Sequence, residues 1–398
     1  MVYNMNKSYN YKDILNQYIK YDQDNKDHAL FQLAQMYFYG NKHPKDHNKA
    51  IEIINDIGNN LPSAYTFLGL AYLYGEDIEK DVEKGIYYLD IAASKNDSDA
   101  ILALSSIYLI DTYVPQDINK ALSLLEQGNQ LGYDNSIVQL GLIYINSPYV
   151  EPDQKKAYEL FVKADGLGNP NASSFLGIMY ENGDYVEKDL KKAFQCYLKG
   201  SSGNSEIGHF FLGKMYYEGV IVKANPKEAV NHFMIAASYG YAQALYRLIE
   251  IYFDDPQISN ITKAKSLLES LLKTADPFAL YMLGKLQIEG LHYPLNVTEG
   301  ISNLEKANTS EANFLLGNIY NQGEITTKDP LVALNYYFAS IELGNEDAIV
   351  EAAEIIIDNA FSNDFLYLLK AAKKLGNPKG IALLGICYLK GLSVKRNI

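Results

Sequence analysis

The segment from Ala172 to Phe194, ASSFLGIMYENGDYVEKDLKKAF, decides the fold of this 398-residue chain. We number its positions from Ala172, which is offset 0. Leu and Gly follow at offsets 4 and 5, Tyr at offset 8, Gly at 11, Asp at 17, Lys at 20 and Ala at 21. The residues at offsets 0, 4 and 8 fall on one stripe of an α-helix, because a helix turns once every 3.6 residues.

The same pattern recurs at intervals of 32 to 36 residues, which indicates an internal repeat. We therefore expect an N-terminal segment, residues 1–28, followed by a repeat array, residues 29–398. The array units start at these anchors: Ala29, Ala64, Ala100, Ser136, Ala172, Gly208, Ala244, Ala279, Ala312, Ala348 and, for a half repeat, Gly380.

Each recurring residue has a physical reason. Gly at offset 5 costs about 1 kcal/mol of helix propensity relative to Ala, so its recurrence indicates the close approach of another helix. Gly at offset 11 suits the left-handed residue after a helix, and Asp or Asn at offset 17 suits the N-cap of a second helix. The second helix has its own apolar stripe, as in Ala193, Phe194, Tyr197 and Leu198.

Each unit is therefore predicted to be a helix-turn-helix hairpin. One hairpin cannot bury its apolar faces alone, so consecutive hairpins stack. The predicted fold is all-α: a right-handed α-solenoid of about ten and a half repeats of about 36 residues. First helices would line one surface and second helices the other.

The pattern A-x-x-x-L-G-x-x-Y-x-x-G, followed by D-x-x-K-A, resembles the Sel1-like repeat, a relative of the tetratricopeptide repeat. The resemblance covers residues 29–398, with clear copies at Ala64, Ala172 and Ala312. Local departures are Ser105, Ile249 and Ala353 in place of Gly at offset 5, and the Ala244 unit lacks the capping Asp. The resemblance implies a scaffold for complex assembly, membrane-protein quality control or host–microbe contacts.

The charge balance bears on the class of partner. The net charge of −13 argues against binding nucleic acids or an anionic membrane surface. No apolar stretch is long enough to span a membrane, and the N-terminus lacks the apolar core of a signal peptide. Two distant cysteines exclude a disulfide framework, so we expect a cytoplasmic protein.

No constellation of residues predicts catalysis, a cofactor or a metal. His43 and His47 flank Pro44 in a turn, and His209 and His232 lie on the two helices of one unit. Cys196 has an apolar helical context that suits core packing. Cysteine-rich Sel1-like proteins are linked to β-lactam hydrolysis, but this chain lacks those cysteines. We therefore expect no enzyme, and such a hydrolase is the least favoured alternative.

A binding surface is predicted on the first helices at offsets 2, 6, 9 and 10, by analogy with tetratricopeptide arrays. It is apolar in the first four units and mixed aromatic and acidic from the fifth, which suggests one hydrophobic and one basic partner segment. The alternative is that the early apolar residues are buried between units. The predicted partner-binding residues are Tyr74, Leu109, Ile145, Glu181, Tyr217, Glu218, Tyr246, Glu250, Asp254, Tyr281, Glu289, Phe314 and Gln322.

The sequence therefore predicts a non-enzymatic scaffold or adaptor that binds protein segments along the first helices. RNA binding by helical-hairpin repeats is the alternative, which the acidic charge disfavours.

The two ends of the array differ. Residues 9–20 carry Ile14, Leu15, Tyr18 and Ile19 on one stripe and would cap the first unit. At the other end, the half repeat would expose an apolar face with Leu384, Tyr388 and Leu389. We expect that face to self-associate, to meet a partner, or to mark a truncated gene.

Overall fold

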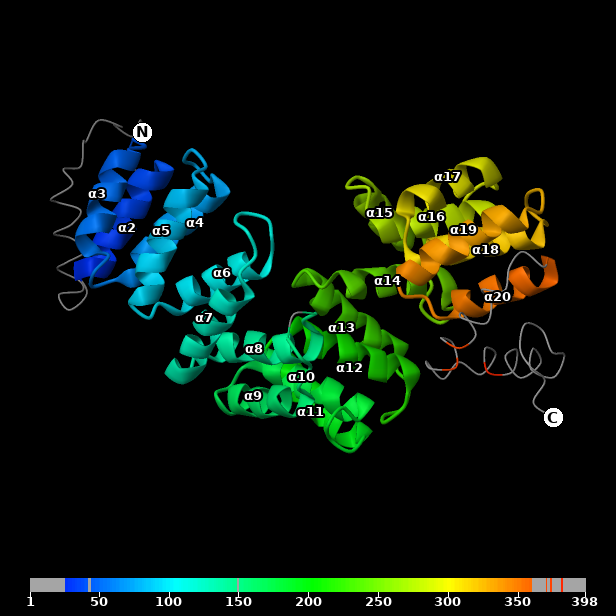
Figure 1. Cartoon of the computed structure of the whole chain (residues 1–398), viewed down its shortest axis with the longest axis horizontal. Helices are drawn as coiled ribbons and strands as arrows, with labels where there is room; N and C mark the ends of the chain where they lie inside the picture. The colour runs from blue at the N-terminus through cyan, green and yellow to red at the C-terminus, as the bar shows by residue number, and fades with distance from the viewer. Residues whose placement is uncertain are drawn as a thin grey trace, which may run out of the picture. The chain divides into compact units, whose positions relative to one another are not determined.

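The structure, a computed structural model, describes residues 26–41, 44–148 and 150–359, together with residues 370, 373 and 381. Regular secondary structure in these residues is α-helical throughout (Figure 1). The chain divides into two compact units, an N-terminal unit that ends at Tyr241 and a C-terminal unit that begins at Ala242. The predicted all-α solenoid of helical hairpins is confirmed.

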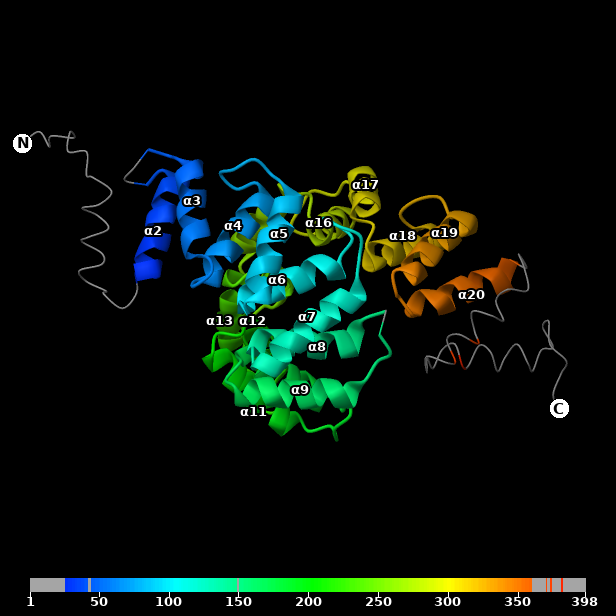
Figure 2. The ribbon, with the colours of Figure 1, turned by 60° about the vertical axis from the view of Figure 1, so that its left-hand side comes forward.

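The described part of the N-terminal unit holds six hairpins, each made of a first and a second helix. They are α2 (Lys26–Tyr39) with α3 (His47–Ile57), α4 (Pro62–Tyr74) with α5 (Val82–Ser94), α6 (Ser98–Leu109) with α7 (Ile118–Leu131), α8 (Asp134–Asn146) with α9 (Gln154–Gly166), α10 (Pro170–Asn182) with α11 (Leu190–Ser202), and α12 (Glu206–Glu218) with α13 (Pro226–Ser238). Figure 2 shows α4 to α9 stacked in chain order, as their contacts require.

The C-terminal unit has the same construction over residues 242–359. Its hairpins are α14 (Ala242–Asp254) with α15 (Ile261–Leu272), α16 (Pro277–Glu289) with α17 (Val297–Ala307), and α18 (Ser310–Gln322) with α19 (Pro330–Glu342); α20 (Asp347–Asn359) follows as a further first helix.

A pair of hydrogen bonds at one Asp or Asn closes every described hairpin. The side chain of this capping residue accepts from a backbone N–H in the first turn of the second helix, as Asp81 does from Lys84 at 3.0 Å. Its own backbone N–H donates to the carbonyl at offset 8 of the first helix, as from Asp81 to Tyr72 at 2.9 Å. The capping residues are Asp46, Asp81, Asp117, Asp153, Asp189, Asn225, Asn260, Asn296 and Asp329.

The Ala244 unit is therefore capped after all, which corrects one expectation. Asn260 takes the capping role one position earlier than in the other units, and its side chain accepts from the N–H of Lys263 at 3.0 Å. The turn is one residue shorter, so a search at offset 17 alone misses the cap.

Glycine at offset 5 brings the two helices of a hairpin together, as predicted. A Cβ placed on Gly141 would lie 2.6 Å from the Phe161 ring, and one on Gly177 would lie 2.5 Å from the Tyr197 ring. Both rings, at offset 25, are fully buried. Where offset 5 carries a larger residue, offset 25 or its equivalent is aliphatic: Ala34 with Ile54, Ser105 with Leu125, and Ile249 with Leu268.

The recurrent Lys of the second helix has a packing role that the sequence did not reveal. In six described hairpins its ammonium lies over the ring of the offset-8 Tyr, a cation–π contact. The Nζ of Lys120 is 4.3 Å from the centre of the Tyr108 ring and donates to its hydroxyl at 2.7 Å. The other pairs are Lys49–Tyr37, Lys84–Tyr72, Lys156–Tyr144, Lys192–Tyr180 and Lys263–Tyr252.

His209 and His232 meet inside the sixth hairpin, where their Nδ1 atoms are 2.9 Å apart. Burial lowers the pKa of both imidazoles, and His209 lowers that of His232 further. The Ser201 carbonyl and the Glu228 carboxylate act in the opposite direction on His209 and His232 respectively. Tyr216 stacks on the His232 ring, with centres 5.5 Å apart.

Three expectations lie outside the described residues. These are the capping helix over residues 9–20, the environment of His43, and the half repeat with Leu384, Tyr388 and Leu389. All three stay predictions.

Replacing Gly141 by Ala tests the close approach of the two helices. The added methyl group overlaps the Phe161 ring, which costs about 1–3 kcal/mol of unfolding free energy, against about 1 kcal/mol of gained helix propensity. Combining Gly141→Ala with Phe161→Leu recreates the pairing of a small residue with Leu seen in the third hairpin. Urea denaturation should give a favourable coupling of about 1 kcal/mol in the double-mutant cycle. Strict additivity would show that the glycine serves another purpose.

The histidine pair predicts a pH dependence of stability. Because the folded-state pKa values lie below the ordinary value, the unfolded chain binds more protons as the pH falls through about 6.5, and stability falls with it. The units that start at Ala100 and Ser136 carry Ile and Leu at the two equivalent positions. The variant His209→Ile with His232→Leu should therefore fold. Its thermal midpoint should drop less between pH 7.5 and 5.5 than that of the unaltered protein. An equal drop would contradict this, and the exposed His28→Gln is the matched control.

Candidate functional site

One position on the first helices faces solvent in all nine described hairpins. It is offset 10, which lies at or directly after the last residue of the first helix. We call these residues the offset-10 row: Tyr39, Tyr74, Ile110, Asn146, Asn182, Glu218, Asp254, Glu289 and Gln322. The capping bond to the carbonyl at offset 8 recurs beside this position in each of these hairpins.

The chemistry of the offset-10 row changes along the chain. Tyr39, Tyr74 and Ile110 are large, apolar and 42%, 54% and 51% exposed. Two Asn residues follow, and Glu218 ends the row in the N-terminal unit. Within the C-terminal unit the row is Asp254, Glu289 and Gln322. The apolar and acidic parts predicted from the sequence therefore both reach solvent at this one position.

The predicted residues at offset 9 lie largely between hairpins. Leu109 and Ile145 are half-buried and pack against the hydrophobic core. Glu181 accepts a hydrogen bond from the Tyr197 hydroxyl at 2.7 Å and forms an ion pair with Lys214 at 2.9 Å. Burial and the Glu181 carboxylate raise the pKa of Tyr197 far above its usual range. Glu181 thus joins two successive hairpins.

Tyr217, also at offset 9, is half-buried. Offset 6 is represented by Glu250, whose carboxylate pairs with Arg247 of the same helix at 2.9 Å. Glu250 also acts on Tyr281 of the next hairpin. Burial is the largest cause that raises the pKa of the Tyr281 phenol, and the negative charges of Glu311, Glu250 and Glu289 raise it further.

The residues at offset 2 connect one hairpin to the next. The hydroxyl of Tyr246 donates to Asp276, the N-cap of α16, at 2.8 Å, and its ring stacks on Phe278 at 4.2 Å. Burial is the larger cause, and the hydrogen bond to the Asp276 carboxylate the second, that together raise the pKa of Tyr246 to about 12. Phe314 is an exception, since its ring lies 5.7 Å, centre to centre, from the Tyr337 ring of its own hairpin. Equivalent bonds in the N-terminal unit are Thr66–Asp97 and Ser174–Ser205. This side-chain role carried no signal in a single repeat.

A groove opens on the first helices between α4 and α6, with a volume of about 340 Å³. It contains Tyr74 and Ile110 of the offset-10 row. Sequence reasoning missed Tyr113, which reaches the groove from the turn after α6. The remaining lining is Leu70, Asp99, Leu102, Ala103, Ser106 and Ile107.

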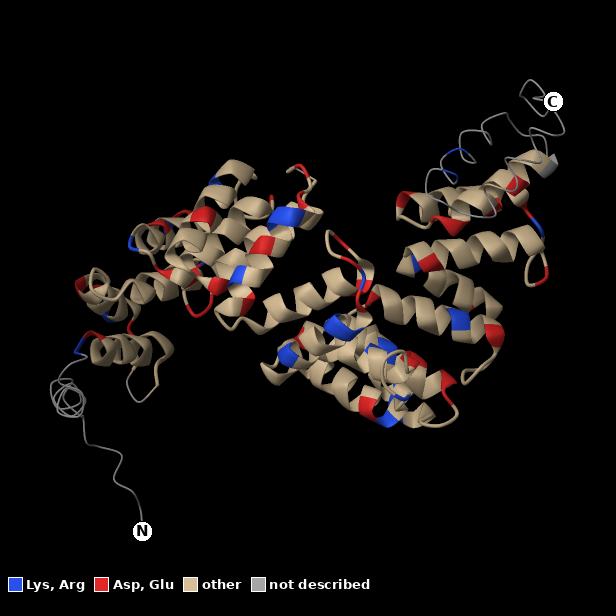
Figure 3. Ribbon diagram, turned by 90° about the horizontal axis from the view of Figure 1, so that it is seen from below, with Lys and Arg blue, Asp and Glu red and all other residues tan. Residues whose placement is uncertain are grey.

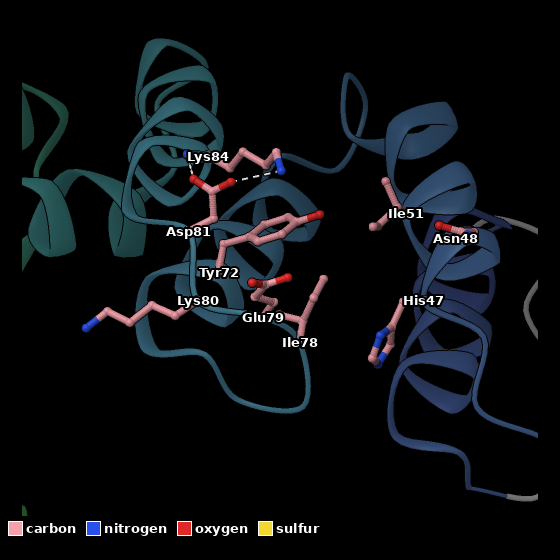
Figure 4. Close-up of a pocket in the computed structure, with 9 residues that line it drawn as sticks. All are labelled: His47, Asn48, Ile51, Tyr72, Ile78, Glu79, Lys80, Asp81 and Lys84. Carbon is pink, nitrogen blue, oxygen red and sulfur yellow. Dashed lines mark hydrogen bonds and ion pairs between the residues drawn. The ribbon is translucent and has the colours of Figure 1, made fainter.

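A second hollow, of about 490 Å³, lies between α3 and the turn that joins α4 to α5 (Figure 4). Two of its charged groups bind each other, since Lys84 pairs with the Asp81 carboxylate at 2.8 Å. Lys80 extends away from α3 in Figure 4. The Nε2 atom of His47 is buried there without a hydrogen-bond partner.

Groups that could bind a metal or react are sparse in the described residues. No cluster of three or more His, Cys, Asp or Glu side chains there could hold a metal ion. Burial raises the pKa of the Cys196 thiol, which disfavours the reactive thiolate. Within the described part of the chain, no helix is long and apolar enough to cross a membrane.

Acidic residues outnumber basic ones in the helices of the C-terminal unit that the structure describes. Its residues 242–359 include 17 Asp and Glu and only 7 Lys and Arg. Figure 3 shows these charges on the ribbon. Residues 360–398 of the same unit add one Asp and seven Lys and Arg, so the whole unit has 18 acidic and 14 basic residues. Glu289 and Asp254 of the offset-10 row therefore lie among described helices with an excess of carboxylates, which favours cationic partners.

Comparison with known proteins agrees with this repeat architecture. The family model for the Sel1 repeat matches residues 27–53, 62–97, 98–133, 135–164, 170–205, 207–241, 277–308, 310–345 and 378–398. The units at Ala244 and Ala348 are without a match, and they are two of the units in which a larger residue replaces Gly at offset 5.

Two solved structures share the fold. One is c5321, a protective antigen of uropathogenic Escherichia coli strains with an SLR fold: 22% identity, TM-score 0.52, covering 94% of this chain and 90% of that one. The other is a Sel1 repeat protein from Oxalobacter formigenes: 22% identity, TM-score 0.54, covering 61% and 99%.

A curated relative matches over a shorter region. The alginate biosynthesis protein AlgK of Pseudomonas syringae pv. tomato is 26% identical over 118 residues, 29% of this chain. The chain spans only a quarter (25%) of that relative's length. The matched repeats cover well over half of the chain, so this protein belongs to the Sel1 repeat family.

Proposed function

We propose that this protein is a non-enzymatic scaffold or adaptor that binds extended segments of other proteins along its first helices. Sel1 repeats typically mediate protein–protein interaction, which supports the class of function. The observation that carries the proposal is the offset-10 row, whose side chains are exposed in every described hairpin beside a capping bond to offset 8 that recurs in each. A cytoplasmic location and self-association through the C-terminal half repeat stay predictions.

The acidic residues of the offset-10 row indicate the charge of the partner segment. Asp254 and Glu289 are exposed at the ends of α14 and α16, among described helices in which Asp and Glu outnumber Lys and Arg. A segment rich in Lys or Arg gains attraction there, whereas RNA would place phosphates against the carboxylates. The basic protein segment is therefore the partner chemistry that fits this unit.

Charge reversal at these two residues tests the proposal. The probe is a fluorescein-labelled 20-residue peptide of repeating Lys-Ala-Ser-Leu, followed by fluorescence anisotropy at low salt. The variant Asp254→Lys with Glu289→Lys should raise the Kd about tenfold or more, because two attractive charges become repulsive. Added salt should weaken binding to the unaltered protein.

The matched control is Glu269→Lys with Glu342→Lys, two exposed carboxylates on the second helices α15 and α19. It changes the net charge equally and should leave the Kd within about twofold. Equal weakening by both double variants would show that only net charge matters. An unchanged Kd in the first variant would contradict the proposed surface.

A further inference from the structure

The groove between α4 and α6 lies on the first helices and has a mainly apolar lining. Leu70, Leu102, Ala103 and Ile107 line it, together with the exposed Tyr74 and Ile110. Its volume of about 340 Å³ lies at the lower end of the usual range for small-ligand pockets, about 300–1,000 Å³. That size suits one or two side chains of a bound peptide rather than a folded domain.

One small residue accounts for the opening. Ser106 is at offset 6, where the flanking hairpins carry Leu70 and Leu142, and its own side chain is exposed. The hydroxyl of Ser106 donates to the Leu102 carbonyl at 3.0 Å, so it is turned back onto its own helix. A larger residue at this position would fill the space.

The aromatic wall of the groove is held in place by its neighbours. The Tyr113 ring meets the Tyr74 ring edge-on, with centres 6.4 Å apart. The ammonium of Lys80 lies 5.1 Å from the centre of the Tyr113 ring. Both contacts hold the Tyr113 ring in place before a ligand binds. Binding therefore loses less side-chain conformational entropy at this wall.

The rim adds charge selectivity. Asp99 lies exposed in the first turn of α6 and lines the groove. The ammonium of Lys80 lies against the Tyr113 ring. A cationic residue beside an apolar one in the ligand therefore complements the groove and its rim.

We propose that this groove anchors one large apolar side chain, aliphatic or aromatic, of a partner segment that carries Lys or Arg within a few residues of it. The inference rests on the proposed scaffold function and names the partner chemistry for the N-terminal unit. A second copy of this chain is a poorer occupant, because two copies each carry a net charge of −13.

The test uses fluorescein-labelled 12-residue peptides of Gly and Ser with two Lys residues around one central position. That position is Ala, Leu, Phe or Trp. Anisotropy titration of the full chain should give a Kd at least about tenfold lower for Leu, Phe or Trp than for Ala, since a large apolar side chain leaves water. No preference over Ala would overturn the proposal.

Ser106→Phe fills the groove and should abolish the preference while leaving the Ala peptide's Kd unchanged. The matched control is Ser202→Phe on α11, another exposed serine whose hydroxyl also donates to the carbonyl four residues earlier. It should keep the preference intact. Circular dichroism and thermal midpoints check that both variants fold. A preference that survives Ser106→Phe, or is lost in Ser202→Phe, overturns the assignment.

Asp99→Lys tests the charge selectivity of the rim. It should raise the Kd of the Lys peptides severalfold and lower that of counterparts with Glu in place of Lys, with the preference for Phe retained. Equal changes for both peptide series would contradict a cationic neighbour.

Two further outcomes would reassign the groove. Concentration-dependent dimerisation of the unaltered chain that Ser106→Phe removes would make a second copy the occupant. Displacement of the Phe peptide by a synthetic peptide of residues 1–25 would make it the chain's own N-terminal segment. Failure of the scaffold function is distinct, since no peptide, including the Ala peptide, would then bind in a salt-dependent way.

Discussion

Everything in the described array depends on one residue per hairpin, the Asp or Asn that caps the second helix. Its side chain accepts from the first turn of that helix, and its backbone N–H donates to the carbonyl at offset 8 of the first helix. These two bonds set where the second helix begins relative to the first. The glycine at offset 5 then lets the helices approach, so that rings such as Phe161 and Tyr197 are fully buried against it.

The two capping bonds and the glycine contact form a frame that stabilises each hairpin, and the residues that could bind a partner lie outside this frame. Offset 10 lies between the offset-8 carbonyl and the turn, and its side chain is exposed in every described hairpin. It can therefore change from Tyr and Ile in the early hairpins to Asp and Glu in the later ones without a change in fold. The result is a helical repeat whose surface chemistry varies along the chain while its backbone repeats.

The frame could be predicted from the sequence, and part of the surface could not. The spacing of Gly, Tyr and Asp was sufficient for the hairpins because those residues act within one repeat. Glu181 looked free by its offset, but Tyr197 and Lys214 bind it from elements 16 and 33 residues further along the chain. Tyr246 is engaged by Asp276 of the next hairpin in the same way. Tyr113 lies in a turn of irregular sequence, where periodicity gives no signal. Contacts between repeats cannot be inferred from the spacing of residues within one repeat, so only the three-dimensional structure reveals them.

Site-specific photocrosslinking tests the central claim most directly. A benzoylphenylalanine at Ile110 or Glu289 of the offset-10 row would be compared with one at Tyr87 or Glu342, exposed residues on second helices. The probe is the same labelled Lys-Ala-Ser-Leu peptide at equal occupancy. The account predicts crosslinked product from the offset-10 positions and little from the second helices. Equal or stronger crosslinking from Tyr87 and Glu342 would contradict it.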